Sequence, residues 1–152
     1  MDRRVARLQT ITECDTFLKN ALRLGHRDLA QQARQRSIEI RALSHDAQTQ
    51  AEREAIEAIY AYETVLSEKR GRKTRASRTW QMIKRHGILM AVERAVNREG
   101  QTAGYAALLE MGLERYAFEV VVVRHPHLFS QECVERSKQR IAQWDLPKMS
   151  HE

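Results

Sequence analysis

Apolar residues recur at intervals of three and four along most of the chain, which is the period of an amphipathic α-helix. The clearest example lies between Thr49 and Gly71. Thr49 and Glu52 have the spacing of a capping box, in which each side chain accepts the amide hydrogen of the other residue. We therefore expect a helix over residues 50–70. At about 1.5 Å per residue it would span about 30 Å, the width of a small domain, and would be central to the fold.

The same period predicts further helices, separated by glycine, proline and capping residues. In the first half of the chain they cover residues 13–24, with Thr12 as the cap, and residues 28–43. The junction between them, residues 24–30, resembles the turn of a tetratricopeptide-type helical hairpin, but no 34-residue recurrence follows it. In the second half the expected helices cover 77–86, 88–96, a short segment with Tyr105 and Leu108, and 131–144.

Residues 118–123 are ambiguous, because the β-branched run Val120 to Val123 also suits a buried strand. A single strand would have no partner in a chain that otherwise predicts helices, so we favour a helix there. The expected fold class is all-α, a single compact domain of about seven or eight short helices packed as antiparallel hairpins. The domain would span 1–152, with a possible sub-division near 71–76 and a frayed tail at 145–152.

Composition agrees with a helical globular protein, since the chain holds only six glycines and two prolines among 152 residues. A chain of this length buries enough surface to fold without a disulfide or a metal. The two cysteines, Cys14 and Cys133, lie far apart. The start of the chain lacks the apolar core of a signal peptide, and no apolar run approaches the ~20 residues that span a bilayer. We expect a cytoplasmic protein with free thiols and no membrane partner.

Positive charge is concentrated in one part of the chain. The formal net charge is +6, yet residues 69–98 contain ten Lys/Arg and one Asp/Glu, whereas the segments on both sides are slightly acidic. A localised excess of this kind creates a directed positive potential. A nucleic-acid backbone is the typical partner, because Lys and Arg neutralise its phosphates and release counterions.

Within this window, the stretch KRGRKTRASRTW joins two predicted helices and ends in Trp80. Its hydroxyl residues can donate to phosphate, and the amides at the start of the helix over 77–86 form a natural anion site. No acid lies at that start, although acids are favoured there. Trp80 is expected to turn inward as a core residue rather than to stack on a base. The candidate nucleic-acid contacts are Lys69, Arg70, Arg72, Lys73, Arg75, Ser77, Arg78, Lys84 and Arg85.

Three other interpretations of the window stay open. Its cations would form a merely solvated face if they paired with glutamates of the 50–70 helix, such as Glu63 and Glu68. They would also suit an acidic protein partner, which would make the chain a helical adaptor. A helix-turn-helix centred on Gly87 matches only weakly, because the helix over 88–96 is too apolar to lie in a major groove.

Metal and catalytic motifs are not evident. His125 and His127, with Cys133 or Cys14, fall short of the four ligands in recognisable pairs that structural zinc requires. We expect neither a metal nor another cofactor. Nucleophile elbows, Walker loops and HExxH are lacking, although a site assembled from distant residues would leave no local motif. A homodimer formed through exposed tyrosines is a further open alternative.

The sequence therefore predicts a small non-enzymatic nucleic-acid-binding protein, with DNA favoured over RNA. It would contact the phosphate backbone through the basic loop and helix start at residues 69–85. The alternative is a protein–protein adaptor whose basic face docks an acidic partner.

Overall fold

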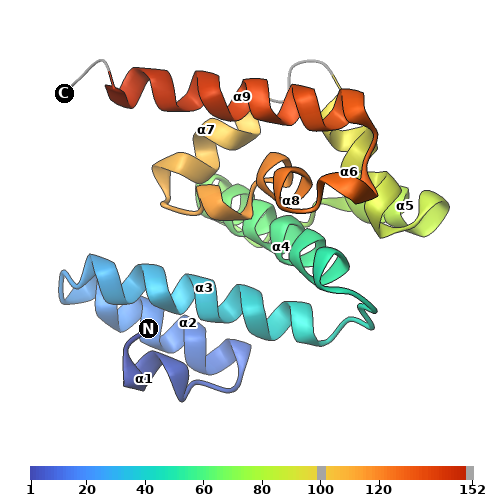
Figure 1. The fold of residues 1–152 in the computed structure, drawn as a ribbon. Coiled ribbons are helices and arrows are strands. Elements are labelled where there is room, and N and C mark those ends of the chain that lie inside the picture. Colours follow the sequence, from blue (N-terminus) through green and yellow to red (C-terminus); the bar gives the residue numbers. More distant parts are fainter. Residues whose placement is uncertain (99–101, 150–152) are drawn as a thin grey trace.

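The computed structural model describes residues 1–98 and 102–149, and all regular structure within them is helical (Figure 1). This confirms the predicted all-α class. In these ranges the chain forms nine α-helices, slightly more than the seven or eight expected, and two 3₁₀ turns. They are α1 (Arg3–Ala6), α2 (Ile11–Arg23), α3 (Arg27–Leu43), α4 (Gln50–Arg70), α5 (Ser77–His86), α6 (Ile88–Asn97), α7 (Thr102–Glu110), η1 (Glu114–Tyr116), α8 (Phe118–Arg124), η2 (Pro126–Leu128) and α9 (Gln131–Met149).

Helix α4 occupies the centre of the molecule, as its length predicted. It packs against α3 on one side and against α6, α7 and α8 on the other. Helices α2 and α3 lie side by side at one edge, and α9 crosses the opposite edge, where it covers α6 and α8 (Figure 1). The basic window therefore begins at the end of the central helix and continues into α5 and α6.

Two hydrophobic clusters form the core, and α4 contributes to both. One cluster joins Val65 of α4 to Leu108 of α7 and to its neighbours. The other joins Ala55 of α4 to Val92 of α6 and Val122 of α8. Burial of such apolar side chains is the main driving force of folding, so α4 is the element that connects the two halves of the core.

Local capping signals set most of the helix boundaries. The Thr49 side chain accepts the Glu52 amide at 3.2 Å, as predicted, but the Glu52 carboxylate accepts the amide of Gln48 rather than that of Thr49. Gly71 ends α4, as predicted, and has the left-handed conformation with φ of 68°. The first long helix, however, begins at Ile11 rather than at residue 13, and its cap is Thr10, not Thr12. Thr10 accepts the Glu13 amide at 3.1 Å. Thr12 has Asp15 at the same spacing, whereas Thr10 has the glutamate that is typical of a capping box.

Residues 118–123 are helical, as expected, and belong to α8. Val121 and Val122 are buried there, so tertiary packing outweighs the strand preference of β-branched residues. Helix α9 runs on past Trp144, its expected end, to Met149. Within the described ranges, none of the helices is both long and apolar enough to cross a membrane.

Candidate nucleic-acid interface

The predicted contact residues lie on three consecutive pieces of structure. Lys69 and Arg70 end α4, the loop of residues 71–76 follows, and α5 carries the remainder. Every one of the nine is exposed. Lys84 and Arg85 occupy the last turn of α5, the opposite end from Ser77 and Arg78, where their charge complements the helix dipole. The predicted set thus divides into a larger group around the loop and a smaller group at the far end of α5.

The loop is held against α4 by two side chains of that helix. The Ser67 hydroxyl accepts the Thr74 amide at 2.9 Å. The carboxylate of Glu63, which is only 5 % exposed, accepts the Ala76 amide at 2.9 Å and the indole N–H of Trp80 at 2.6 Å. Because both ends of the segment from Thr74 to Trp80 are bonded to α4, Arg75 and Arg78 project from an anchored backbone.

Trp80 turns inward, as the sequence predicted. Its ring stacks on His45, with centroids 5.1 Å apart and planes at 7°, and it lies tilted against Tyr60 at 5.3 Å. Together with the bond to Glu63, these contacts give Trp80 a structural role in fixing α5. The ring is therefore packed against other side chains of the protein and is not available to stack on a nucleobase.

The cations of the basic window have no ion-pair partner among the residues that the structure describes. None of the Lys and Arg side chains of residues 69–98 forms an ion pair with another described residue. The nearby acids are used elsewhere, since Glu68 pairs with Arg34 at 2.9 Å and Glu93 accepts the Ser130 amide at 2.7 Å. Pairing with the glutamates of α4, which would have made this a neutralised face, is not observed in the described ranges.

The start of α5 is likewise without a negative group of its own. Its first turn holds no acid, and no side chain of its N-cap residue, Ala76, caps it. The helix dipole places partial positive charge at this end, where a free anion is favoured. The Glu63 carboxylate of α4, which accepts the Ala76 amide at 2.9 Å, offsets part of that charge.

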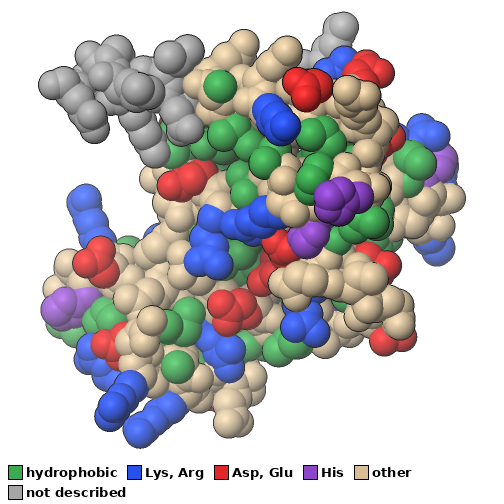
Figure 2. Space-filling model, in the orientation of Figure 1, with side chains coloured by type: hydrophobic (Ala, Val, Ile, Leu, Met, Phe, Trp, Pro, Cys, Tyr) green, Lys and Arg blue, Asp and Glu red, His purple; other side chains and the backbone are tan. Residues whose placement is uncertain are grey.

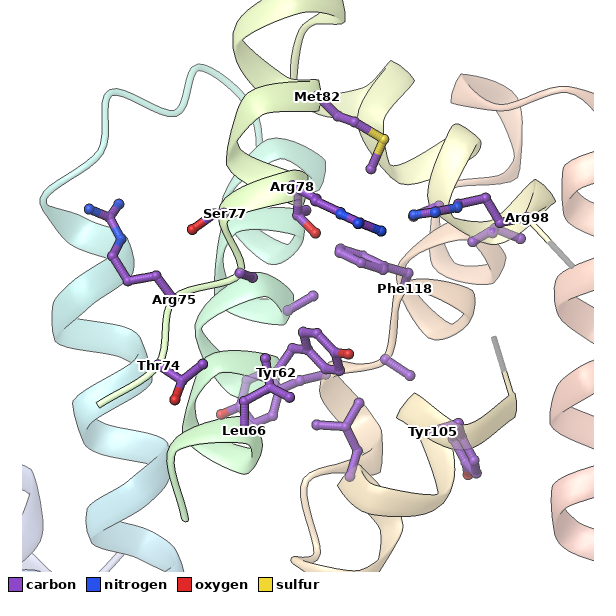
Figure 3. Close-up of a pocket in the computed structure, with 18 of the residues that line it drawn as sticks. Tyr62, Leu66, Thr74, Arg75, Ser77, Arg78, Met82, Arg98, Tyr105 and Phe118 are labelled. Carbon is purple, nitrogen blue, oxygen red and sulfur yellow. The ribbon is translucent and has the colours of Figure 1, made fainter. Parts of the chain in front are cut away.

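A cavity of about 400 Å³ lies between α4, the loop, α5 and the segment from α6 to α8 (Figure 3). Four of the nine predicted residues line it: Arg70, Arg75, Ser77 and Arg78. Figure 3 shows the Arg78 side chain directed into the cavity, while Arg75 and Ser77 turn to the other side of the loop. Lys69, Arg72, Lys73, Lys84 and Arg85 are not among its lining residues.

Several residues that no sequence pattern singled out also line this cavity. Arg98 follows the end of α6, Phe118 begins α8, and Tyr62 and Leu66 project from α4. Arg98 is the last cation of the basic window, so charge counting offered a signal for it. No local pattern marks Phe118, because its place beside α5 arises only from the tertiary fold.

Glu119 is the one acid among the described residues that line the cavity. It is 6 % exposed, and its carboxylate binds Arg140 of α9 at 3.1 Å. Burial raises the pKa of Glu119, and the hydrogen bond to Arg140 opposes that rise. Because its carboxylate is paired with Arg140, Glu119 is not an ion-pair partner of the arginines at the rim.

The residues considered for a DNA-reading helix and for a metal site have structural roles instead. Helix α6 buries Ala91, Val92, Ala95 and Val96, so it packs in the core and not on the surface as a DNA-reading helix would. His125 binds the Glu54 carboxylate at 2.6 Å. In the portion of the chain that the structure covers, no three His, Cys, Asp or Glu side chains are grouped as a metal would require.

Figure 2 shows one face of the molecule, where Lys and Arg side chains appear at the edge occupied by α5 and also across the rest of the face. Over α1 to α4 on the same face, basic and acidic side chains are interspersed, in keeping with the near-balanced charge of that part of the sequence. Comparison of the chain with protein-family models, with curated proteins and with solved structures finds no match.

Proposed function

We propose that this protein binds nucleic acid, with DNA favoured, through the phosphate backbone. The observation that carries the proposal is the set of exposed cations on residues 69–85, which have no ion-pair partner in the described part of the protein. Unpaired like charges held close together repel each other and lower stability. An external polyanion relieves that repulsion and releases its own counterions on binding.

The fixed backbone of the loop supports the same proposal. Ser67 and Glu63 bind the amides of Thr74 and Ala76, on either side of Arg75, and the Arg72 amide donates to the Ser67 carbonyl at 3.2 Å, so the loop backbone is anchored without a ligand. Less side-chain and loop entropy is then lost on binding than a flexible basic tail would lose. We place the protein in the cytoplasm, in keeping with free buried thiols at Cys14 and Cys133.

The direct test compares two triple variants that remove the same charge. The first is Arg72→Ala, Lys73→Ala and Arg75→Ala in the basic loop. The control is Lys19→Ala, Arg23→Ala and Arg27→Ala on α2 and α3, where all three side chains are also exposed. Fluorescence anisotropy with a labelled duplex and a labelled single strand measures the affinity of each protein.

The loop variant is expected to lose at least tenfold in affinity, while the control stays close to wild type. Equal losses would mean that net charge alone drives binding. If neither nucleic acid is retained at about 50 mM salt, where phosphate binding is strong, the proposal fails. Retention of polyglutamate in its place would then favour the adaptor with an acidic protein partner.

A further inference from the structure

Two arginines at the rim of the cavity, Arg78 and Arg98, face each other and form a candidate anion site. Arg78 comes from the first turn of α5, and Arg98 comes from the residue that follows α6. Figure 3 shows their guanidinium groups pointing toward each other across the cavity. Neither side chain has an ion-pair partner among the described residues. Two facing cations repel each other unless an anion is bound between them.

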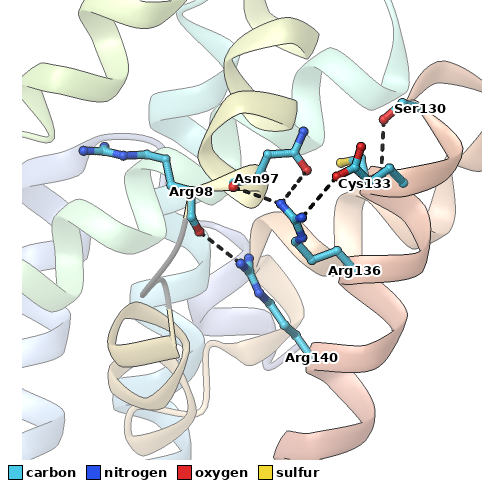
Figure 4. A network of polar contacts seen from close by, with 7 residues as sticks. Asn97, Arg98, Ser130, Cys133, Arg136 and Arg140 are labelled. Atoms are coloured by element: carbon cyan, nitrogen blue, oxygen red, sulfur yellow. Dashed lines mark hydrogen bonds and ion pairs between the residues drawn. The ribbon is translucent and has the colours of Figure 1, made fainter.

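Two arginines of helix α9 hydrogen-bond to the backbone at Asn97 and Arg98 and hold it in place. Arg140 donates to the Arg98 carbonyl at 3.0 Å, and Arg136 donates to the Asn97 carbonyl at 2.9 Å and to its side-chain oxygen at 3.2 Å (Figure 4). These bonds satisfy carbonyls at the end of α6 that have no partner within the helix. The Arg98 side chain points away from α9 in Figure 4, toward the cavity side. Its backbone is therefore held by α9, and its guanidinium forms no ion pair with any other described residue.

The wall below the two arginines is apolar and aromatic. Phe118 extends into the space beside both guanidinium groups, and Tyr62 and Leu66 line the wall further in (Figure 3). All three side chains are only partly buried, so a ligand in the cavity would cover surface that the protein itself leaves open. Aromatic side chains of this kind offer a face on which a nucleobase stacks.

Size and chemistry together restrict the occupant. A volume of about 400 Å³ falls in the range of small-molecule sites, roughly 300–1,000 Å³. Two guanidinium groups bind one phosphate with bidentate geometry, and the apolar wall suits a flat, weakly polar group. A nucleotide unit carries both parts on one short framework.

We propose that the cavity binds one unpaired nucleotide, with its phosphate between Arg78 and Arg98 and its base against Phe118 and Tyr62. The nucleotide belongs to the strand that the basic loop contacts, so this inference rests on the proposed function. A free nucleoside monophosphate carries the same chemistry and is the other possible source. The site predicts a preference for single strands, because a base paired in a duplex cannot enter the cavity.

The experiment measures the affinity of three ligands for the wild-type protein and for two variants. The ligands are a short single strand, the blunt duplex of the same sequence, and a free nucleoside monophosphate. The variants are Arg98→Ala and, as the matched control on α6, Arg94→Ala, which removes an exposed cation that does not line the cavity. Fluorescence anisotropy measures the two strands, and calorimetry measures the nucleotide.

We expect the single strand to bind more tightly than the duplex, and Arg98→Ala to weaken single-strand binding at least tenfold. Duplex binding by Arg98→Ala should change no more than that by Arg94→Ala. The inference is overturned if the two variants behave alike with every ligand, or if single strand and duplex bind equally. If neither strand binds but the mononucleotide does, with dependence on Arg98, the cavity site is supported while the proposed nucleic-acid function fails.

Discussion

Trp80 donates its indole N–H to the carboxylate of Glu63, with Nε1 2.6 Å from Oε2. The same oxygen accepts the amide of Ala76, the residue before α5. One acid on the central helix therefore determines where the basic loop ends and how α5 is placed. This arrangement explains why a segment with so many cations has a defined backbone.

Glu63→Gln tests the strength of this anchor. The substitution keeps the shape of the side chain but removes the charge from two hydrogen bonds, and bonds to charged groups contribute about 1.5–3 kcal/mol. We expect the free energy of unfolding, measured in urea, to fall by roughly that amount. Glu68→Gln is the control on the same helix. Its ion pair with Arg34 is partly exposed, so its loss should cost under about 1 kcal/mol. Equal losses in the two variants would refute the anchoring role of Glu63.

Gly71→Ala tests the turn that starts the loop. Gly71 has φ of 68°, and a Cβ added there would meet no atom within 4 Å. The cost therefore comes from the backbone conformation alone, about 1–2 kcal/mol for a residue with a Cβ. Gly71→Asn should cost less, because asparagine tolerates this conformation better. Thermal unfolding of both variants measures the difference, and an alanine variant as stable as wild type would contradict this account of the turn.

Glu57→Gln is expected to stabilise the protein at neutral pH. Burial raises the pKa of Glu57, and the carboxylates of Glu39 and Glu54 raise it further, while Arg115 and Arg53 oppose them. The folded state therefore disfavours the ionised form, and stability is lost as the pH rises from the ordinary glutamate pKa of 4.5 through the raised pKa of the folded state. The gain in melting temperature from the substitution should vanish well below pH 4.5, where the carboxyl is protonated in both the folded and the unfolded state.

The control for this prediction is Glu52→Gln. Glu52 lies in the first turn of α4 and accepts the Gln48 amide, so its negative charge favours the helix. We expect this variant to gain nothing at neutral pH. A gain of the same size in both variants would show that net charge, rather than burial of Glu57, causes the effect.

The cysteine thiols should be inert in the folded protein. Burial raises the pKa of Cys133 to about 11, and it also raises the pKa of Cys14. Both side chains are almost completely buried, and the thiolate is the reactive form. Ellman's reagent at mildly alkaline pH should therefore modify neither thiol until guanidinium unfolds the chain. Rapid modification of the native protein would contradict the burial of these residues.

Local signals in the sequence were enough to predict most of the helices. The capping box at Thr49 and the left-handed Gly71 act within one turn of the chain, so their effect can be read without the fold. The Thr12 prediction was wrong although the same local pattern was available: both threonines have an acid three residues later, but only Thr10 has the glutamate typical of a capping box. The extra short helix α1 was not predicted, although its cap, Asp2, is a local signal of the same kind.

The candidate site was predictable only in part. The charge of each segment can be counted along the sequence, but which side chains from separate helices meet at one cavity depends on the tertiary fold. The count of Lys and Arg located the basic window, and Arg78 indeed points into the cavity. Arg98 and Phe118 reach the same space through α6 and α8, whose placement depends on the core around α4. The role of Glu63 was also hidden, because its bond to Trp80 joins residues on two separate helices.

The salt dependence of DNA binding tests the central claim most directly. If the basic loop and α5 neutralise about six phosphates, the logarithm of the association constant should fall against the logarithm of salt concentration with a slope of about −5. The triple variant of Arg72, Lys73 and Arg75 should reduce the magnitude of that slope by about 3, because each cation that is removed leaves one phosphate without a partner. A slope near zero in the wild type, or a slope that the triple variant leaves unchanged, would contradict the account.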